Sequence, residues 1–266
     1  MKNNKLHRFS RTEILIGSNA LAEQAAKHAM IFGIGGVGSH AAEALGRAGI
    51  GRITLVDFDS VCLTNINRQI HALSSTVGRP KVEVMAERLL DINPDANITP
   101  IKAFFSNDNA EELMQLRPDY VLDAIDHFTA KTALIIFCRE RNIPIISSMG
   151  AANKLDPTKI RVDDISATHN CRMSRSMRKI LRQRGITDGV KVVYSTEEHR
   201  ELSGDMTHCD VQGILSKLKE QTYRRAILGS ASYIPAIFGM TMAGMVVNDL
   251  LSKTQKRAPE VSQFMS

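Results

Sequence analysis

One short run of glycines constrains the fold of this chain more than any other feature. The run Gly33-Ile-Gly-Gly-Val-Gly38 follows an apolar stretch at 29–32 and precedes a helical pattern at 39–47. Glycine permits positive φ and lets the backbone approach an anion closely. The helix N-terminus beyond it offers unpaired N–H groups and the positive end of a dipole. Four glycines therefore predict a phosphate-binding turn: Gly33, Gly35, Gly36 and Gly38.

Strand and helix patterns alternate through the first 150 residues. Short apolar, β-branched runs mark strands at 29–32, 52–56, 98–102, 120–124 and 143–148. Helical patterns lie between them at 39–47, 81–92, 109–116 and 129–141. This alternation predicts an α/β fold with a Rossmann-like, mostly parallel sheet, whose ligands bind beyond the carboxyl ends of the strands.

The second half of the chain is less regular. It contains a helix pattern at 172–184, a strand pattern at 190–195 and a long apolar helix pattern at 235–251, with an excursion at 196–229. No linker or internal repeat divides the chain. We therefore expect a single domain over 1–266, with a nucleotide-binding half at about 8–150 and an elaborated, substrate-facing C-terminal half at about 151–266.

Composition narrows the class of protein. The net charge of +6 favours an anionic partner. No apolar run is seen to approach the roughly 20 residues that span a bilayer, and the polar N-terminus lacks a secretory signal, so a cytoplasmic protein without a membrane partner is expected. The four cysteines are far apart and form no C-x-x-C pair, which excludes a four-thiolate zinc site and favours reduced thiols.

The residues after the second strand decide which nucleotide is expected. Asp57 can accept a hydrogen bond from a ribose hydroxyl, and this arrangement alone suits a nicotinamide dinucleotide equally well. Arg68 and Lys81 favour ATP, because attack at an α-phosphorus builds negative charge on the leaving pyrophosphate that cations neutralise. Asn65 and Gln69 can position phosphate or ribose oxygens. For any single cation, solvated surface charge is the alternative.

Asp126 follows the strand at 120–124 on the same edge of the sheet. Mg²⁺ prefers one or two carboxylates together with phosphate oxygens, so Asp126 is the candidate metal ligand. A carboxylate at a strand-to-helix junction can also serve as a helix N-cap. Both roles are compatible.

Five motifs occur in order along the first half: Gly33-Ile-Gly-Gly-Val-Gly38, Val56-Asp-Phe-Asp59, Thr64-Asn-Ile-Asn-Arg-Gln69, Val77-Gly-Arg-Pro-Lys81 and Asp123-Ala-Ile-Asp126. The set resembles the ubiquitin-activating-like (ThiF/MoeB/HesA) adenylyltransferase superfamily over roughly 8–150. The resemblance implies binding of ATP and Mg²⁺, attack of a carboxylate on the α-phosphorus and release of pyrophosphate. It assigns the ribose to Asp57, the phosphates to Asn65, Arg68 and Lys81 with support from Gln69, and Mg²⁺ to Asp126.

Arg8-Phe-Ser-Arg11 resembles the N-terminal segment of the same superfamily. The resemblance implies a homodimer in which Arg11 reaches a triphosphate across the interface. Without it, Arg11 is only one basic residue near the N-terminus.

Three further stretches resemble the tRNA threonylcarbamoyladenosine dehydratase branch: Arg68-Gln-Ile-His-Ala72, Ser147-Ser-Met-Gly-Ala-Ala-Asn-Lys-Leu-Asp-Pro157 and Arg172-Met-Ser-Arg175. This implies adenylation of the threonine carboxylate of a modified tRNA adenosine, followed by ring closure with loss of AMP. Two alternatives stay open. The chain could adenylate the C-terminus of a small sulfur-carrier protein, or it could be a non-catalytic nucleotide-binding scaffold.

Some members of this branch work with a cysteine-desulfurase system and carry a cysteine before a Phe-Ser-Thr-Glu-like segment. Val192 stands at that position here, so we expect no thiol relay there, while a sulfur-transfer partner stays open. Cys171 and Cys209 lack an obvious neighbouring base, and we expect structural thiols rather than thioester formation.

Four cations recur at helical spacing in the second half and form one stripe: Arg172, Arg175, Lys179 and Arg182. Such a stripe suits the phosphate backbone of tRNA, and a solvated helix face is the alternative. The small residues at 148–150 and 230–232 could shape an acceptor pocket or bind a monovalent cation, K⁺ or Na⁺, although packing explains them equally well.

Overall fold

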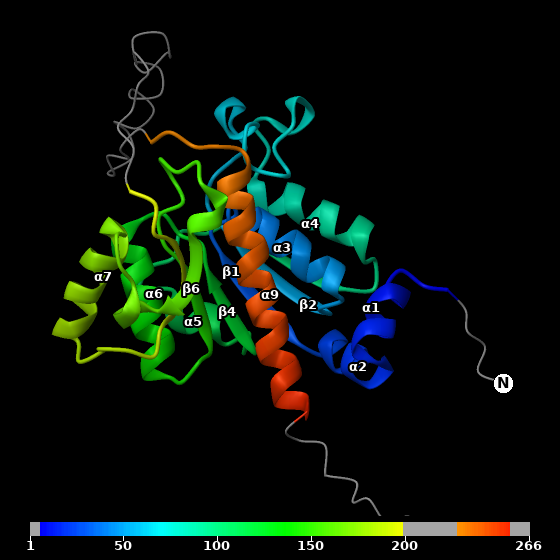
Figure 1. The fold of residues 1–266 in the computed structure, drawn as a ribbon. Coiled ribbons are helices and arrows are strands. Elements are labelled where there is room, and N and C mark those ends of the chain that lie inside the picture. The colour runs from blue at the N-terminus through cyan, green and yellow to red at the C-terminus, as the bar shows by residue number, and fades with distance from the viewer. Residues whose placement is uncertain (1–5, 199–227, 256–266) are drawn as a thin grey trace, which may run out of the picture.

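One sheet organises the residues that the computed structural model describes, which are 6–198 and 228–255 (Figure 1). Its seven strands are β1 (His28–Phe32), β2 (Arg52–Val56), β3 (Asn97–Ile101), β4 (Tyr120–Asp123), β5 (Ile145–Ser148), β6 (Ile160–Asp164) and β7 (Lys191–Ser195). They lie in the order β3-β2-β1-β4-β5-β7-β6. Each neighbouring pair is parallel except β6 and β7. The expected mostly parallel sheet is confirmed.

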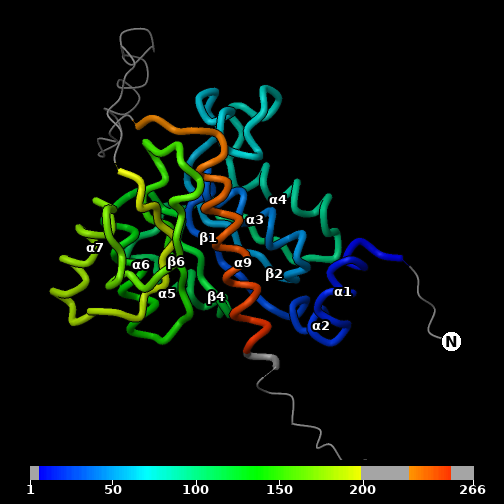
Figure 2. Tube along the Cα trace, viewed as in Figure 1, coloured from blue at the N-terminus to red at the C-terminus, as the bar shows by residue number. Residues whose placement is uncertain are grey.

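Helices cover both faces of this sheet (Figure 2). One face carries α3 (Gly38–Ala48), α4 (Lys81–Ile92) and α9 (Tyr233–Gln255). The other carries α5 (Ala110–Met114), α6 (Phe128–Glu140) and α7 (Arg172–Gln183). Two short helices, α1 (Ser10–Ile16) and α2 (Ser18–Ala25), precede β1. The resulting three layers give each buried face of the sheet a helical partner.

Strand β1 shows how the sequence divides the core in two. Ala29 and Ile31 pack into the cluster under α3, α4 and α9, whereas Met30 and Phe32 pack into the cluster under α5, α6 and α7. Successive side chains of a strand point to opposite faces. A strand buried on both faces is therefore apolar at every position, and this is why 29–32 lacks the alternation of a half-exposed strand.

The expected elements of both halves are present, with most bounds shifted by only one or two residues. Among the α-helices and strands of the described residues, three were not predicted from the sequence: α1, α2 and β6. Strand β6 is an antiparallel edge strand in which Arg161, Asp163 and Asp164 interrupt the apolar pattern. Most of the excursion expected at 196–229 lies outside the described residues.

The order of the strands fixes where a ligand can bind. Strands β1 and β4 are neighbours, with Phe32 paired to Asp123. From β1 the chain crosses to β2 on one side, and from β4 it crosses to β5 on the other. The carboxyl ends of β1 and β4 therefore flank the switch point of the sheet, the usual place for a ligand in such folds.

Helix α9 corrects one expectation from composition. Residues Tyr233–Ser252 are long and apolar enough to cross a membrane, by length and composition alone. The expectation that no apolar run approaches this length was wrong, because this helix combines many apolar and small residues with few charges. Phe238, Met242 and Val246 are fully buried against the sheet and α3. A buried core helix passes the same test, so the absence of a membrane partner stays a prediction.

The crossing of α9 over α3 gives a test of the packing. A Cβ at Gly239 would lie 2.2 Å from the carbonyl oxygen of Val37, whereas a Cβ at Gly244 would have nothing within 4 Å. We expect Gly239→Ala to destabilise the fold by about 1–3 kcal/mol, because the helices must separate. Gly244→Ala is the matched control and should be neutral or stabilising by up to about 1 kcal/mol. Urea unfolding measures both, and equal effects would contradict the close crossing.

Candidate functional site

The four glycines of the turn have different tasks. Gly33 has φ +86°, and a Cβ there would lie 2.6 Å from the carbonyl oxygen of Ala124. A Cβ at Gly38 would lie 1.8 Å from the carbonyl oxygen of Gly33. A Cβ at Gly35 would meet only Nε2 of Gln69, at 3.9 Å. Gly33 and Gly38 are therefore required by the fold, and the backbone at Gly35 is the part of the turn with room for a ligand.

Asp57 holds the turn in place. Its Oδ2 accepts from the backbone N–H of Ile34 at 2.6 Å, and its Oδ1 accepts from that of Asp59 at 2.8 Å. Burial raises the pKa of this carboxyl, and Lys81 opposes the rise. The residue predicted to bind a ribose is thus also the carboxylate that fastens β2 to the glycine turn.

Lys81 is buried at the first position of α4, with 5% of its surface exposed. Its Nζ lies 2.9 Å from Oδ2 of Asp59. A buried ammonium needs a charged or strongly polar partner, and Asp59 supplies one. The sequence identified Lys81 but gave Asp59 no role. The sequence did contain a signal for Asp59 as a site residue, because it is the second carboxylate of Val56-Asp-Phe-Asp59 and follows Asp57 by two residues.

Arg68 lies across the glycine turn. A Cβ at Gly36 would lie 3.3 Å from Cγ of Arg68 and 2.9 Å from Cβ of Pro235. The Nη1 atom of Arg68 donates to the carbonyl of Thr64 at 3.0 Å. Burial lowers the pKa of the guanidinium, and the carboxylate of Asp126 acts in the opposite direction. Arg68 and Asp126 therefore come close enough to interact electrostatically beside the turn.

Gln69 and Asn65 complete this side of the site. Gln69 is 5% exposed, and its Oε1 is buried without a hydrogen-bond partner in the described structure. A buried orphan acceptor is rare in native proteins and suits a donor group on a ligand. Asn65 is also buried, and its Oδ1 accepts from the backbone N–H of Cys62 at 3.0 Å. The oxygen of Asn65 thus stabilises the loop, which leaves its amide nitrogen for a ligand.

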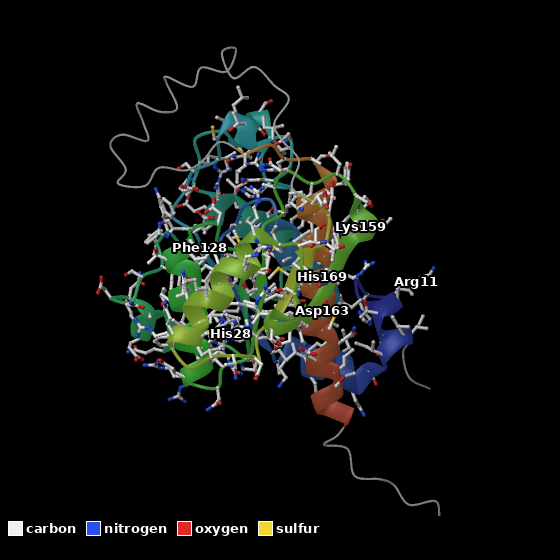
Figure 3. All side chains as sticks on the ribbon, turned by 60° about the vertical axis from the view of Figure 1, so that its left-hand side comes forward. Arg11, His28, Phe128, Lys159, Asp163 and His169 are labelled. Carbon is white, nitrogen blue, oxygen red and sulfur yellow. The ribbon has the colours of Figure 1, made fainter. Side chains whose placement is uncertain are left out.

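Arg11 lies at the other end of the domain. Phe9 contacts the position of a Cβ at Gly49, and Arg8 donates to the carbonyl of Ile92, so α1 packs beside the C-terminal ends of α3 and α4. The turn lies at the N-terminal end of α3, and a helix of 11 residues is about 16 Å long. Figure 3 shows Arg11 well apart from Phe128, which begins α6 next to Asp126. The structure does not bring Arg11 to the turn of its own chain.

The predicted basic stripe is exposed on α7. Arg172, Arg175, Lys179 and Arg182 are all exposed. Ser174, Met177 and Leu181 are buried on the opposite side of the helix. Arg178, which is not part of the stripe, donates to the carbonyl of Thr168 at 2.9 Å and anchors the loop before α7.

The cysteines of the described residues are free, as expected. Cys138 is fully buried, and burial raises the pKa of its thiol to about 12. Cys171 is buried and accepts from the N–H of Ser174 as the N-cap of α7. Val192 is buried in the core on β7. These placements agree with structural thiols, whereas Cys209 lies outside the described residues.

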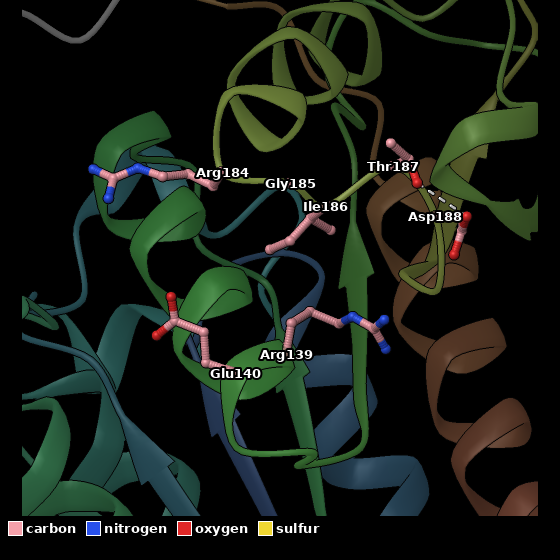
Figure 4. A pocket seen from close by; sticks show the side chains of 7 residues that line it. All are labelled: Arg139, Glu140, Arg184, Gly185, Ile186, Thr187 and Asp188. Atoms are coloured by element: carbon pink, nitrogen blue, oxygen red, sulfur yellow. Dashed lines mark hydrogen bonds between the residues drawn. The ribbon is translucent and has the colours of Figure 1, made fainter.

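A hollow of about 190 Å³ lies far from the turn, between the end of α6 and the loop at 184–188 (Figure 4). Its two arginines, Arg139 and Arg184, point away from one another. The hollow therefore does not gather charge on a single ligand. The chemistry-bearing residues gather instead at the carboxyl edge.

Comparisons with known proteins identify the relatives of this chain. A model of the ThiF family matches residues 9–265. The tRNA threonylcarbamoyladenosine dehydratase of Bacillus subtilis is 43% identical over 246 residues, which cover 92% of this chain and 95% of that protein. The solved structure of E. coli tRNA N6-threonylcarbamoyladenosine dehydratase in complex with ATP superposes with a TM-score of 0.83 at 37% identity, covering 94% and 96% of the two chains.

A relative of the sulfur-carrier type matches less of the chain. The molybdopterin-synthase adenylyltransferase of Escherichia coli is 35% identical over 158 residues. The match covers 59% of this chain and 62% of that protein. The likeness to the Bacillus subtilis dehydratase thus covers 92% of the chain, and the likeness to this adenylyltransferase covers 59% of it.

His71 is a buried residue beside the site whose state the sequence did not predict. It is 2% exposed, and neither ring nitrogen has a hydrogen-bond partner in the described structure. Burial lowers its pKa to about 4, and the nearby charges of Lys81 and Arg88 and the ring of His40 add to the shift. The fold therefore holds His71 in its neutral form at neutral pH.

This burial predicts a loss of stability in acid. Between the ordinary pKa of 6.5 and the folded value of about 4, the unfolded chain binds a proton that the folded chain refuses. Stability contributed by neutral His71 is complete above pH 6.5 and falls by about 2 kcal/mol at pH 4.5. We expect His71→Met to lose less stability than wild type between pH 7 and pH 4.5. Urea unfolding at both values measures this, and identical losses would contradict it.

Proposed function

The chain belongs to the ThiF family, and we propose that it uses ATP to activate the carboxylate of threonylcarbamoyladenosine in tRNA and promotes the cyclisation of that nucleoside. In this role it is an ATP-dependent tRNA threonylcarbamoyladenosine dehydratase. Relatives with that name match more than nine-tenths of the chain.

The observation that carries the proposal is the convergence at the glycine turn. Arg68 lies against Gly36, and Gln69, whose Nε2 lies nearest to Gly35, also has a buried oxygen without a hydrogen-bond partner in the described structure. Lys81 is buried at the first position of α4, and Asp126 interacts with Arg68 from the loop that follows β4. Two cations, an orphan acceptor and a carboxylate around a bare backbone suit a nucleoside triphosphate better than a nicotinamide, because hydride transfer builds no charge on phosphate.

The first step is the transfer of an adenylyl group. A carboxylate oxygen of the substrate attacks the α-phosphorus of ATP, and the bond from that phosphorus to the bridging oxygen breaks. The electron pair leaves with pyrophosphate. Arg68 and Lys81 stabilise the charge that develops on the leaving group. The Lys81 ammonium is already desolvated, which strengthens its interaction with an anion.

Mg²⁺ fits the donor set at this edge. Within the described residues no group of three or more His, Cys, Asp or Glu side chains could hold a metal by itself. Mg²⁺ that arrives with a nucleotide needs only one or two carboxylates, and Asp126 is the exposed carboxylate beside Arg68. When bound, the ion neutralises phosphate charge.

The second step needs no nucleophile from the protein. An atom of the same nucleoside attacks the activated acyl carbon, and AMP departs with one oxygen of the former carboxylate. The substrate thus loses the elements of water, while ATP becomes AMP and pyrophosphate. An intramolecular attack gains from the proximity of its two groups. This agrees with the buried, structural state of Cys138 and Cys171.

A homodimer would bring Arg11 to the site. Helix α1 buries no residue of its own, and Ile14 and Leu15 are more than four-fifths exposed. The loop beside the glycine turn also exposes apolar residues, among them Leu63 and Leu73. A two-fold symmetric dimer that packs α1 of one copy on this loop of the other would cover both surfaces. Arg11 would then reach the phosphates of the partner's ATP.

The stripe on α7 provides the tRNA-binding surface. Its four exposed cations project from a helix whose other side is fixed in the core. A row of cations on a rigid helix suits contacts to backbone phosphates, which carry no sequence information.

Three expectations stay predictions with their own measurements. Cell fractionation tests a cytoplasmic location, and affinity capture with a cysteine desulfurase tests a sulfur-transfer partner. A monovalent cation near Ser148 and Ser230 would make activity depend on K⁺ or Na⁺. In the structure, Ser148 and Ser230 each donate to the carbonyl of the following residue.

Removal of either cation should abolish most of the first step. We expect Arg68→Ala or Lys81→Ala to lower the kcat of pyrophosphate release by about 100- to 1,000-fold, because each loses charge stabilisation in the transition state. Arg79→Ala is the matched control, since Arg79 lies two residues before Lys81 but pairs with Glu87 at the surface. Wild-type rates in both cation variants, in folded protein, would refute the site.

Mixing two inactive variants tests the shared site. If Arg11 acts in the site of the partner, each site takes Lys81 from one chain and Arg11 from the other. Arg11→Ala and Lys81→Ala then damage different chains of that site. Mixed dimers then contain one intact site, and random exchange should restore about one quarter of wild-type activity. An equal mixture is assayed after subunit exchange. No recovery, with exchange verified, would place Arg11 outside the partner's site.

Charge reversal on α7 should weaken the binding of tRNA. We expect Arg175→Glu with Lys179→Glu to reduce tRNA affinity and to leave ATP affinity unchanged. The slope of log affinity against log salt concentration should fall by the amount that about two phosphate contacts contribute. Arg52→Glu with Arg117→Glu changes the same net charge at exposed positions elsewhere and should bind tRNA normally. Filter binding across salt concentrations measures both pairs. Equal losses would mean that net charge, and not the stripe, attracts tRNA.

A further inference from the structure

A lysine with no exposed surface lies directly beneath the loop that carries Asp126. Lys131 is 0% exposed and belongs to the first turns of α6. Its Nζ donates to Oδ2 of Asp123 at 2.7 Å, to Oγ of Ser147 at 3.2 Å and to the carbonyl of Ser148 at 2.9 Å. All three N–H groups of the ammonium have an acceptor. The ion pair with Asp123 is fully buried on both sides.

The partners of Lys131 define what this cluster holds. Asp123 is the last residue of β4, so its ion pair with Lys131 closes both ends of the short loop at 124–127. The other oxygen of Asp123 accepts from the N–H of Ile125 at 3.1 Å, inside that loop. Ser147 donates to Asp123 at 2.5 Å and so adds the end of β5. The cluster ties β4, β5 and α6 together at one point.

The loop closed in this way is also pressed against the glycine turn. The N–H of Ala124 donates to the carbonyl of Phe32 at 2.8 Å, and the carbonyl of Ala124 occupies the space where a Cβ of Gly33 would be. His127 caps α6 by accepting from the N–H of Ala130. Asp126 therefore lies in a loop that is fixed at its first end by Asp123, at its last residue by the cap of α6, and at Ala124 by the contact with the turn.

Stability alone is a poor reason for such a pair. The cost of desolvating two charges is often larger than their attraction, and buried pairs can be replaced by apolar residues without loss of stability. The charges restrict the geometry here, because the ammonium on α6 hydrogen-bonds to three acceptors at fixed places on β4 and β5. These hydrogen bonds fix the position of the loop relative to the turn.

We propose that Lys131, Asp123 and Ser147 form a positioning cluster that sets the place of Asp126 relative to the glycine turn and so governs the affinity of the site for a nucleotide-bound divalent metal. This inference rests on the proposed function for its metal and nucleotide. None of the three residues acts as a catalytic residue. Each acts through the loop.

Removal of both charges together separates positioning from folding. Lys131→Met with Asp123→Leu leaves no uncompensated buried charge, so the protein is expected to fold. Ser147→Ala removes the hydrogen bond to Asp123 and the one accepted from Lys131, and keeps the ion pair. The matched control is Lys191→Met with Asp249→Leu, which removes the lysine–aspartate pair that joins β7 to α9 at the other edge of the sheet.

The measurement is the binding of Mn²⁺ by electron paramagnetic resonance, with the full chain and the non-hydrolysable analogue adenosine 5′-(α,β-methylene)triphosphate. We expect the double variant to raise the dissociation constant of Mn²⁺ about tenfold or more, and Ser147→Ala to change it in the same direction by less. The melting temperature of each variant is recorded beside it. The control pair should change only the melting temperature.

A folded double variant that binds Mn²⁺ as tightly as wild type would overturn the proposal, because the pair would then be only structural. If the double variant does not fold, Ser147→Ala decides, and wild-type Mn²⁺ affinity in that variant overturns the proposal as well. The titration contains no tRNA. Failure of wild type to act on any tRNA would therefore refute the proposed substrate and leave the Mn²⁺ result to decide this inference.

Discussion

The whole site depends on one contact between two backbones. Gly33, at the end of β1, lies so close to the carbonyl of Ala124, at the end of β4, that no side chain could stand between them. The contact is possible because β1 and β4 are paired neighbours and because Gly33 takes a positive φ. It joins the glycine turn, which can receive phosphate, to the loop that carries Asp126. Arg68 and Lys81, which come from other segments, complete the site beside this contact.

Two buried lysines at this edge of the sheet are paired with carboxylates of the scaffold. Lys81 forms an ion pair with Asp59, and Lys131 forms one with Asp123. Asp57 holds the turn by accepting hydrogen bonds from backbone amides. Buried charges are costly unless they are paired, so each pair also restricts the segment that carries it. The result is a rigid edge in which most polar groups are satisfied. Among the described residues of this edge, the oxygen of Gln69, Nδ1 of His40 and both ring nitrogens of His71 are buried without a hydrogen-bond partner.

Particular residues show how far the sequence could predict this arrangement. The strand at 52–56 and the helix at 81–92 were expected with the bounds that the structure gives them, because their patterns are local and regular. Strand β6 escaped prediction because an edge strand needs no continuous apolar run. The burial of Lys131 also escaped, because nothing in a sequence distinguishes a lysine at a helix start from a solvated one. The contact of Pro235 with Gly36 was equally invisible, since it joins distant parts of the chain.

The sequence by itself determined the α/β class, the position of the phosphate-binding turn and the candidate cations, because glycine spacing and apolar periodicity act over a few residues. Only the tertiary structure decided which glycine leaves room for a ligand, which carboxylate pairs with Lys81 and why Arg11 does not reach the turn of its own chain. The physical reason is that these relations depend on distances between segments remote in the chain. Such distances are set by how strands pair and helices pack, and no local pattern records them.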